Sequence, residues 1–123
     1  MQKSILIMDD DKVLANALNM KFKNRGFATN VCYDGEVCSM LMQKERFDVM
    51  LFDLQVPKKD GLTLLQEKST SPNVDTPTYI ITGIGGDEAF SRARELGAKA
   101  CFMKTHTPLS TVVETIQQAV GAA

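Results

Sequence analysis

The chain has 123 residues and a net charge of −1, with 44% hydrophobic and 24% charged residues, as expected for one globular domain spanning residues 1–123. This charge gives no electrostatic basis for binding nucleic acid or an anionic membrane. No apolar run approaches the roughly 18 residues of a membrane span, and three acids at 9–11 interrupt any signal peptide, so we expect a cytoplasmic protein.

Short apolar runs alternate with stretches of helical period along the whole chain. The expected strands are Ser4–Met8, 27–33, Val49–Phe52, Thr78–Thr82 and 99–103. Apolar residues at three- and four-residue spacing predict the helices: Leu14, Ala17, Leu18 and Phe22, ending near Gly26; Val37, Met40 and Leu41; Leu62 and Leu65, after Gly61; Ala89, Ala93 and Leu96, ending at Gly97; and Leu109, Val112, Val113, Ile116 and Val120. For the last helix we expect Thr107 as the N-cap and Pro108 as the first residue.

This order of elements predicts an α/β fold. Five strands that alternate with five helices favour a doubly wound parallel sheet with helices on both faces. The strands are continuous apolar runs and not alternating patterns, which indicates burial on both sides. In such sheets, ligands bind beyond the carboxyl ends of the strands.

Polar residues stand at the ends of four of the expected strands. Asp9, Asp10 and Asp11 follow the first strand, and Asp53 follows the third. The fourth ends in Thr82 and the fifth is followed by Lys104, and a parallel sheet brings all these ends to one edge. Carboxylates suit Mg²⁺, and an Asp can be a nucleophile that forms an acyl phosphate. A hydroxyl and an ammonium can hold phosphoryl oxygens, so the pattern predicts a site for a divalent cation and a phosphoryl group.

Each of these motifs alone has a simpler structural interpretation. The three acids could cap a helix, Asp53 and Thr82 could begin turns, and Lys104 could be a solvated strand end. Their convergence on one edge favours the functional interpretation. Other features are interpreted as structural: Cys32, Cys38 and Cys101 as reduced thiols, His106 and the loop at 58–61 as solvated surface, and most methionines as core residues.

The chain resembles the receiver domain of two-component response regulators over nearly its whole length. The stretches that carry the resemblance are "ILIMDDD" (5–11), "DVMLFDLQVPKKDG" (48–61), "TYIITG" (78–83) and "GAKACFMK" (97–104). The resemblance implies a flavodoxin-like (βα)5 fold with strand order 2-1-3-4-5. It also implies that Asp53 accepts a phosphoryl group from the phosphohistidine of a histidine kinase or a histidine phosphotransfer protein. Thr82 would be the phosphate-sensing residue and Lys104 the phosphate-binding residue.

Further expectations follow from the same resemblance. Mg²⁺ would be bound by Asp10, Asp53 and the backbone carbonyl of Gln55, with Asp9 acting through water. The domain would not be an enzyme in its own right, but would assist its own phosphorylation and dephosphorylation. It would switch conformation to control a partner protein or an output domain, without binding nucleic acid or a membrane itself.

The sequence departs from the family pattern at two positions. Thr105 follows Lys104 where the family usually has a Pro after a cis bond, and Cys101 stands where it usually has Tyr or Phe. Without an aromatic ring at 101, we expect either a modest conformational change at the surface of the fourth helix, fifth strand and fifth helix, or a change carried by the loop at 83–87. Gln55 and Ile84 flank the site and are expected to influence hydrolysis of the acyl phosphate.

Two other functions are compatible with parts of the pattern. An Mg²⁺-dependent phosphohydrolase with an Asp nucleophile would need a second Asp two residues on, where this chain has Gln55. A degenerate receiver that acts only as a protein-interaction module would lack the acceptor Asp or the acid pair, and both are present.

Overall fold

The computed structural model describes residues 2–83 and 86–121. Its elements in chain order are β1 (Ser4–Met8), α1 (Lys12–Asn24), β2 (Ala28–Cys32), α2 (Gly35–Lys44), β3 (Val49–Phe52), α3 (Gly61–Lys68), β4 (Thr78–Thr82), α4 (Asp87–Glu95), β5 (Ala98–Met103) and α5 (Leu109–Val120). Three of the five predicted strands have the bounds expected from the sequence; β2 is shorter than predicted by one residue at each end, and β5 begins one residue earlier. The described helices include none that is long and apolar enough to cross a membrane.

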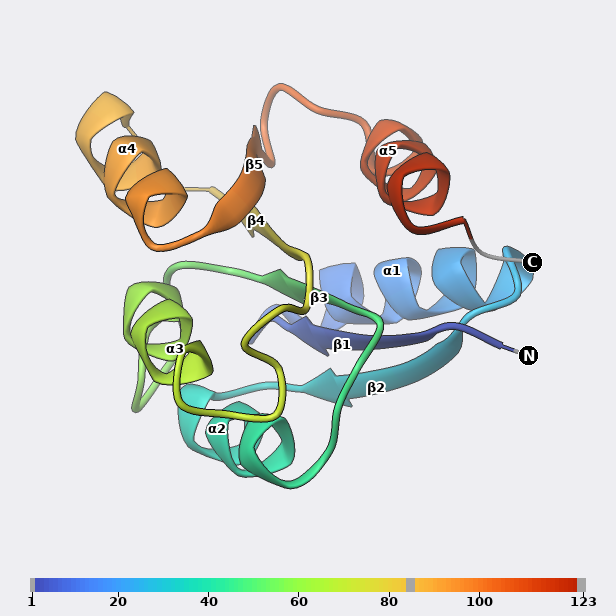
Figure 1. Cartoon of the computed structure of the whole chain (residues 1–123). Helices are drawn as coiled ribbons and strands as arrows, with labels where there is room; N and C mark the ends of the chain where they lie inside the picture. The colour runs from blue at the N-terminus through green and yellow to red at the C-terminus, as the bar shows by residue number, and fades with distance from the viewer. Residues whose placement is uncertain (1, 84–85, 122–123) are drawn as a thin grey trace.

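The five strands form one parallel sheet in the order β2-β1-β3-β4-β5. Helices α1 and α5 cover one face, and α2, α3 and α4 cover the other (Figure 1). The predicted doubly wound α/β fold and its strand order are therefore confirmed.

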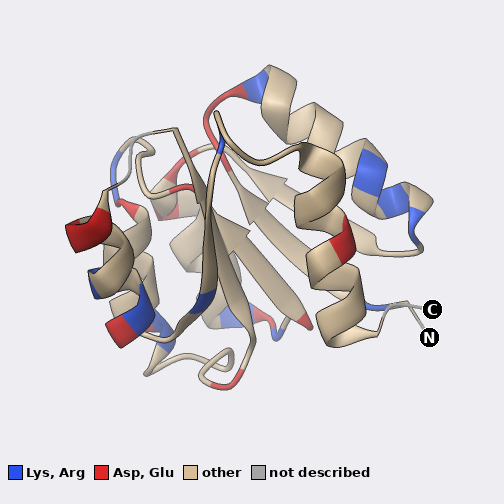
Figure 2. Cartoon of the chain, turned by 90° about the horizontal axis from the view of Figure 1, so that it is seen from above, with Lys and Arg blue, Asp and Glu red and all other residues tan. Residues whose placement is uncertain are grey.

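The core is divided between the two faces of the sheet. Ile5, Ile7 and Leu51 pack against α1 and α5, while Leu6 and Met50 pack against the other three helices. Every residue of β3 and β4 is buried, which explains why these strands are apolar runs. Seen from above, charged residues lie mainly on the helices and loops, and the strands are almost free of them (Figure 2).

The short helix predicted from Val37, Met40 and Leu41 is confirmed as α2. Val37 and Met40 nevertheless lie on its outer side, where they are 46% and 61% exposed. The helix instead buries Cys38, Ser39 and Met42. A polar Ser39 can face inward because its hydroxyl donates to a Glu67 carboxylate oxygen at 2.5 Å. The apolar residues of α2 therefore lie partly on its outer side.

Three smaller expectations are also corrected. The N-cap of α5 is Pro108, which was expected as its first residue, and not Thr107, which belongs to a turn in which its amide donates to the Met103 carbonyl. The carbonyl of Pro108 accepts from the amides of Thr111 and Val112, as an N-cap carbonyl does. Methionines are not confined to the core, since Met20 is exposed as well as Met40.

Candidate functional site

The site lies where β1, β3, β4 and β5 end. Asp9 and Asp53 directly follow β1 and β3, and backbone bonds of the sheet continue through them: the Asp9 amide donates to Cys32, and the Asp53 amide donates to Met8. Their residues are 0% and 3% exposed, respectively. The strands thus fix the backbone of both acids and leave their carboxylates under the surface at the sheet edge.

Three carboxylates gather at this edge. One ligand atom from each of Asp9, Asp10 and Asp53 lies within 4.8 Å of the others. Asp10 is exposed, so the cluster opens to solvent on its side. Three oxygen donors at this spacing fit a hard divalent cation such as Mg²⁺.

Lys104 balances part of this negative charge. Its ammonium nitrogen lies 2.9 Å from Oδ2 of Asp9 and 2.9 Å from Oδ2 of Asp53. It donates a hydrogen bond to Asp53 and forms an ion pair with Oδ2 of Asp9. Because two buried carboxylates share this one cation, the cluster keeps an excess of negative charge, which a bound cation would neutralise.

The electrostatics follow from burial. Burial raises the pKa of the Asp9 carboxyl above its ordinary value, against the opposing effects of Lys104 and the Asp11 amide. Burial alone would lower the pKa of Lys104, but its bonds to Asp53 and Asp9 outweigh that effect and raise it. Lys104 is therefore held as a cation between the two acids.

A cavity of about 590 Å³ opens over these residues. Its lining includes most of the residues predicted from the sequence: Asp10, Asp53, Gln55, Thr82 and Lys104. Thr82 is fully buried, and the backbone amide of Gln55 donates to Asp53 Oδ1 at 3.1 Å. Both Asp53 oxygens are thus oriented, Oδ1 by this amide and Oδ2 by Lys104.

The loop between β3 and α3 forms a wall that the sequence did not reveal. Leu54, Val56, Pro57 and Asp60 also line the cavity. The signal available was Gly61, where an added Cβ would meet the Asp53 carbonyl oxygen at 2.6 Å. Only glycine allows α3 to begin this close to the backbone of Asp53.

The same loop is anchored to two helices, so the expectation of a solvated loop at 58–61 is wrong for Lys59. The Lys59 ammonium donates to Glu67 of α3 at 2.8 Å and to Ser39 of α2 at 3.3 Å. The first residue of α2, Gly35, donates its amide to the Pro57 carbonyl.

The two departures from the family pattern lie beside the site. The Lys104–Thr105 peptide is trans, and the turn after it closes through bonds from the His106 and Thr107 amides to Met103. Cys101 packs half-buried on the side of α4, whereas Phe102 lies on the opposite face. The expectations for Ile84 and for part of the loop at 83–87 concern residues outside the described ranges.

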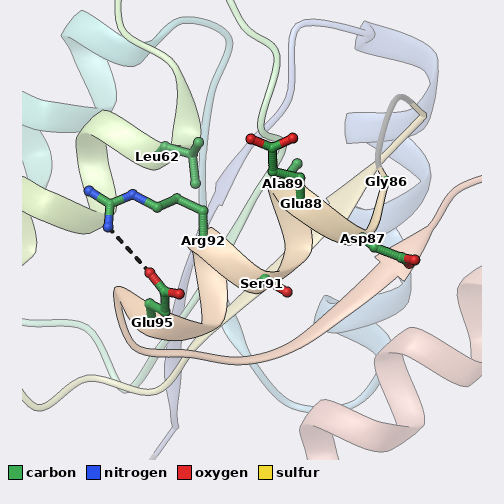
Figure 3. A pocket seen from close by; sticks show the side chains of 8 residues that line it. All are labelled: Leu62, Gly86, Asp87, Glu88, Ala89, Ser91, Arg92 and Glu95. Carbon is green, nitrogen blue, oxygen red and sulfur yellow. Dashed lines mark hydrogen bonds and ion pairs between the residues drawn. The ribbon is translucent and has the colours of Figure 1, made fainter.

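A second, larger groove of about 840 Å³ runs along α4 (Figure 3). It is lined by Leu62 of α3 and by α4 side chains such as Ala89 and Arg92, and it includes none of the acids at the strand ends. Arg92 pairs with Glu95 at 3.5 Å on its rim. The groove is separate from the acidic cluster.

Comparisons with known proteins agree with the geometry. The sequence model of the family described as "Response regulator receiver domain" matches residues 5–117. The chain is 31% identical to sporulation initiation phosphotransferase F of Bacillus subtilis over 85% of this chain and 83% of that protein. It is 29% identical to regulatory protein VanRc of Enterococcus gallinarum over 96% of this chain, but spans only 50% of that protein's length. A CheY-like receiver domain structure from Methanospirillum hungatei superposes with a TM-score of 0.90 at 22% identity, covering 98% of this chain and 95% of that one, which shows the shared fold.

Proposed function

The chain belongs to the response regulator receiver domain family, which serves two-component signalling, and on that premise we propose that Asp53 is its phosphoacceptor. The observation that carries this proposal is the contact of Lys104 with Asp53 at the sheet edge, 2.9 Å between nitrogen and oxygen. It supports a role for Lys104 in receiving the charge of an incoming phosphoryl group.

The transfer requires a donor with a labile phosphoryl group. A carboxylate oxygen of Asp53 attacks the phosphorus of a phosphohistidine, a P–O bond forms, and the P–N bond to the imidazole breaks. The imidazole nitrogen takes up a proton. The product is an acyl phosphate on Asp53 and a free histidine on the kinase or phosphotransfer protein.

The residues around Asp53 have separate roles. The Gln55 amide fixes the orientation of the carboxylate through Oδ1. The Lys104 ammonium moves from the carboxylate to the phosphoryl oxygens, and the Thr82 hydroxyl provides a further contact from the cavity wall. The domain thereby assists its own phosphorylation, and later its dephosphorylation, without an external catalytic residue.

Asp9, Asp10 and Asp53 are suited to hold Mg²⁺, with the Gln55 backbone carbonyl as a further ligand and Asp9 acting through water. When bound, the ion would supply positive charge that neutralises phosphoryl oxygens. The buried carboxylate of Asp9 and the excess of acids over cations in the cluster support this assignment.

The partners and location remain part of the proposal. The domain would act in the cytoplasm, receive its phosphoryl group from a histidine kinase or phosphotransfer protein, and control a downstream protein or output domain. The near-neutral charge supports a role without direct contact to nucleic acid or membranes.

The proposal is tested by incubating the protein with acetyl phosphate and Mg²⁺ and recording its intact mass. We expect one added phosphoryl group, which requires the metal and is absent in Asp53→Asn. Asp60→Asn is the matched control, because Asp60 lines the same cavity but caps α3 through the Thr63 amide. Undiminished labelling of Asp53→Asn would reject the assignment.

A further inference from the structure

The outer face of α2 carries an ordered stripe of residues that the phosphoacceptor site does not use. Five exposed residues follow helical spacing along it: Glu36, Val37, Met40, Gln43 and Lys44. Val37 and Met40 are apolar and 46% and 61% exposed. In Figure 1, α2 lies at the lower border of the fold, with α3 beside it and the sheet above.

The stripe has an apolar centre and opposite charges at its two ends. Glu36 lies in the first turn of α2 and Lys44 in the last. The two residues stand four positions before and four positions after Met40. A rotation of 180° about an axis that passes through Met40 and is perpendicular to the helix exchanges the acidic and basic ends.

We propose that α2 is a self-association surface, on which a second copy of this chain binds through its own α2 in antiparallel orientation. In this arrangement Met40 contacts Met40 of the second copy, and Glu36 faces Lys44 of the second copy at both ends. The register is centred on Met40, so that Val37 of one copy faces Gln43 of the other.

The charges at both ends are available for this contact. Glu36 pairs with Lys58 only at 3.9 Å, and the Glu36 side chain is 62% exposed. Lys44 is exposed and forms no salt bridge among the described residues. Antiparallel helices also place the positive end of one helix dipole beside the negative end of the other.

The inward side of α2 is rigid enough to present this stripe. The Gly35 amide donates to Pro57, and a Cβ on Gly35 would meet the Lys59 carbonyl oxygen at 1.8 Å, so the helix start is pressed against the loop. Ser39 is bonded to Glu67 and Lys59. The backbone of α2 is thus fixed by bonds to the loop and to α3.

The size of the surface limits its strength. A ten-residue helix is about 15 Å long, so the interface is far smaller than that of a permanent dimer. We therefore expect a transient dimer, visible in sedimentation equilibrium as a rise in weight-average mass between about 0.05 and 1 mM protein.

Two exposed methionines allow a matched test by sedimentation equilibrium. Met40→Glu should abolish the rise in mass, because it places two carboxylates at the centre of the dimer. Met20→Glu on α1, at a site that is 64% exposed, should leave the rise unchanged. A protein that stays monomeric to about 1 mM, or a dimer that Met40→Glu does not weaken, would overturn the proposal.

A charge swap tests the register. Glu36→Lys and Lys44→Glu should each weaken association by about fivefold or more, because each places like charges opposite one another. The double variant Glu36→Lys/Lys44→Glu should recover wild-type association. If it remains as weak as the single variants, the antiparallel register is wrong. Thermal melts of all variants establish that the monomer is folded.

Discussion

The ammonium of Lys104 lies 2.9 Å from the carboxylate of Asp53, although 51 positions separate the two residues in the sequence. Lys104 also reaches Asp9 at the same distance. One cation is thus shared by two buried acids, and Asp10 adds a third carboxylate beside them. This excess of negative charge is the basis of the first two predictions.

Replacing Lys104 by Met should separate metal binding from phosphorylation. Mg²⁺ affinity should rise by about fivefold or more, because the substitution removes about 1 kcal/mol of repulsion between the Lys104 ammonium and the metal ion. Phosphoryl uptake should slow, because no ammonium remains to meet the phosphoryl oxygens. Calorimetric Mg²⁺ titration and phosphorylation kinetics measure the two effects. Lys58→Met, at an exposed lysine, is the control, and weaker metal binding in Lys104→Met would contradict the account.

Magnesium should stabilise the folded protein by mass action, because the three carboxylates are gathered only in the native state. Thermal melts with and without millimolar Mg²⁺ should therefore differ. Asp10→Ala should erase most of that difference. Asp11→Ala, which removes the N-cap of α1, should lower the melting temperature both with and without Mg²⁺ and leave the difference unchanged. A shift that survives in Asp10→Ala would place the metal elsewhere.

Gly61→Ala should disturb the loop between β3 and α3. Alanine is the better helix former, but its Cβ would meet the Asp53 carbonyl oxygen at 2.6 Å and the Leu54 Cα at 3.0 Å. We expect a loss of about 1–3 kcal/mol in the free energy of unfolding, together with slower phosphorylation. In Gly86→Ala, nothing lies within 4 Å of the added Cβ, so urea denaturation should show only the smaller cost of replacing the glycine N-cap of α4. Equal effects of the two substitutions would argue against the close approach.

The ionised Glu67 side chain should stabilise the folded protein at neutral pH but not at low pH. Burial alone would raise the pKa of this carboxyl, but the hydrogen bonds from Lys59 and Ser39 outweigh it and hold the pKa below the ordinary 4.5. A group whose pKa is lowered on folding stabilises the protein above its unfolded pKa and loses that contribution as the pH falls. Both side chains of the pair are partly exposed, so we expect Glu67→Gln to cost about 0.5–1 kcal/mol at neutral pH.

The pH dependence is measured by urea denaturation of wild type and Glu67→Gln between neutral pH and about pH 3. The difference between them should shrink as the pH falls below 4.5 and through the lower pKa of Glu67 in the folded protein. Glu95→Gln is the control, since its exposed pair with Arg92 should contribute little. A Glu67 difference that persists at low pH would show that packing, not charge, is responsible.

The sheet and the acidic site could be predicted from the sequence for one shared reason. Buried parallel strands are short apolar runs, so Val49–Phe52 and Thr78–Thr82 are visible as strands. Their carboxyl ends must lie on one edge, and this brings together Asp53, Thr82 and Lys104 without any knowledge of their contacts.

The parts that could not be predicted depend on particular tertiary contacts. The helix α2 can be predicted from its apolar residues, but its buried face cannot, because Ser39 points inward to bond Glu67, and Val37 and Met40 remain outside. The sequence indicates a surface position for Lys59, because its partners, Ser39 and Glu67, lie 20 and 8 positions away. A single sequence contains no local signal for such bonds.

The central claim is that the phosphoryl group is carried by the carboxylate of Asp53. The most direct measurement is borohydride reduction of the phosphorylated protein, which converts an aspartyl phosphate to homoserine, followed by mass spectrometry of its peptides. The account predicts homoserine at position 53, only in samples that contained Mg²⁺ and a phosphodonor. Homoserine at position 9, 10 or 60 in place of 53 would contradict it.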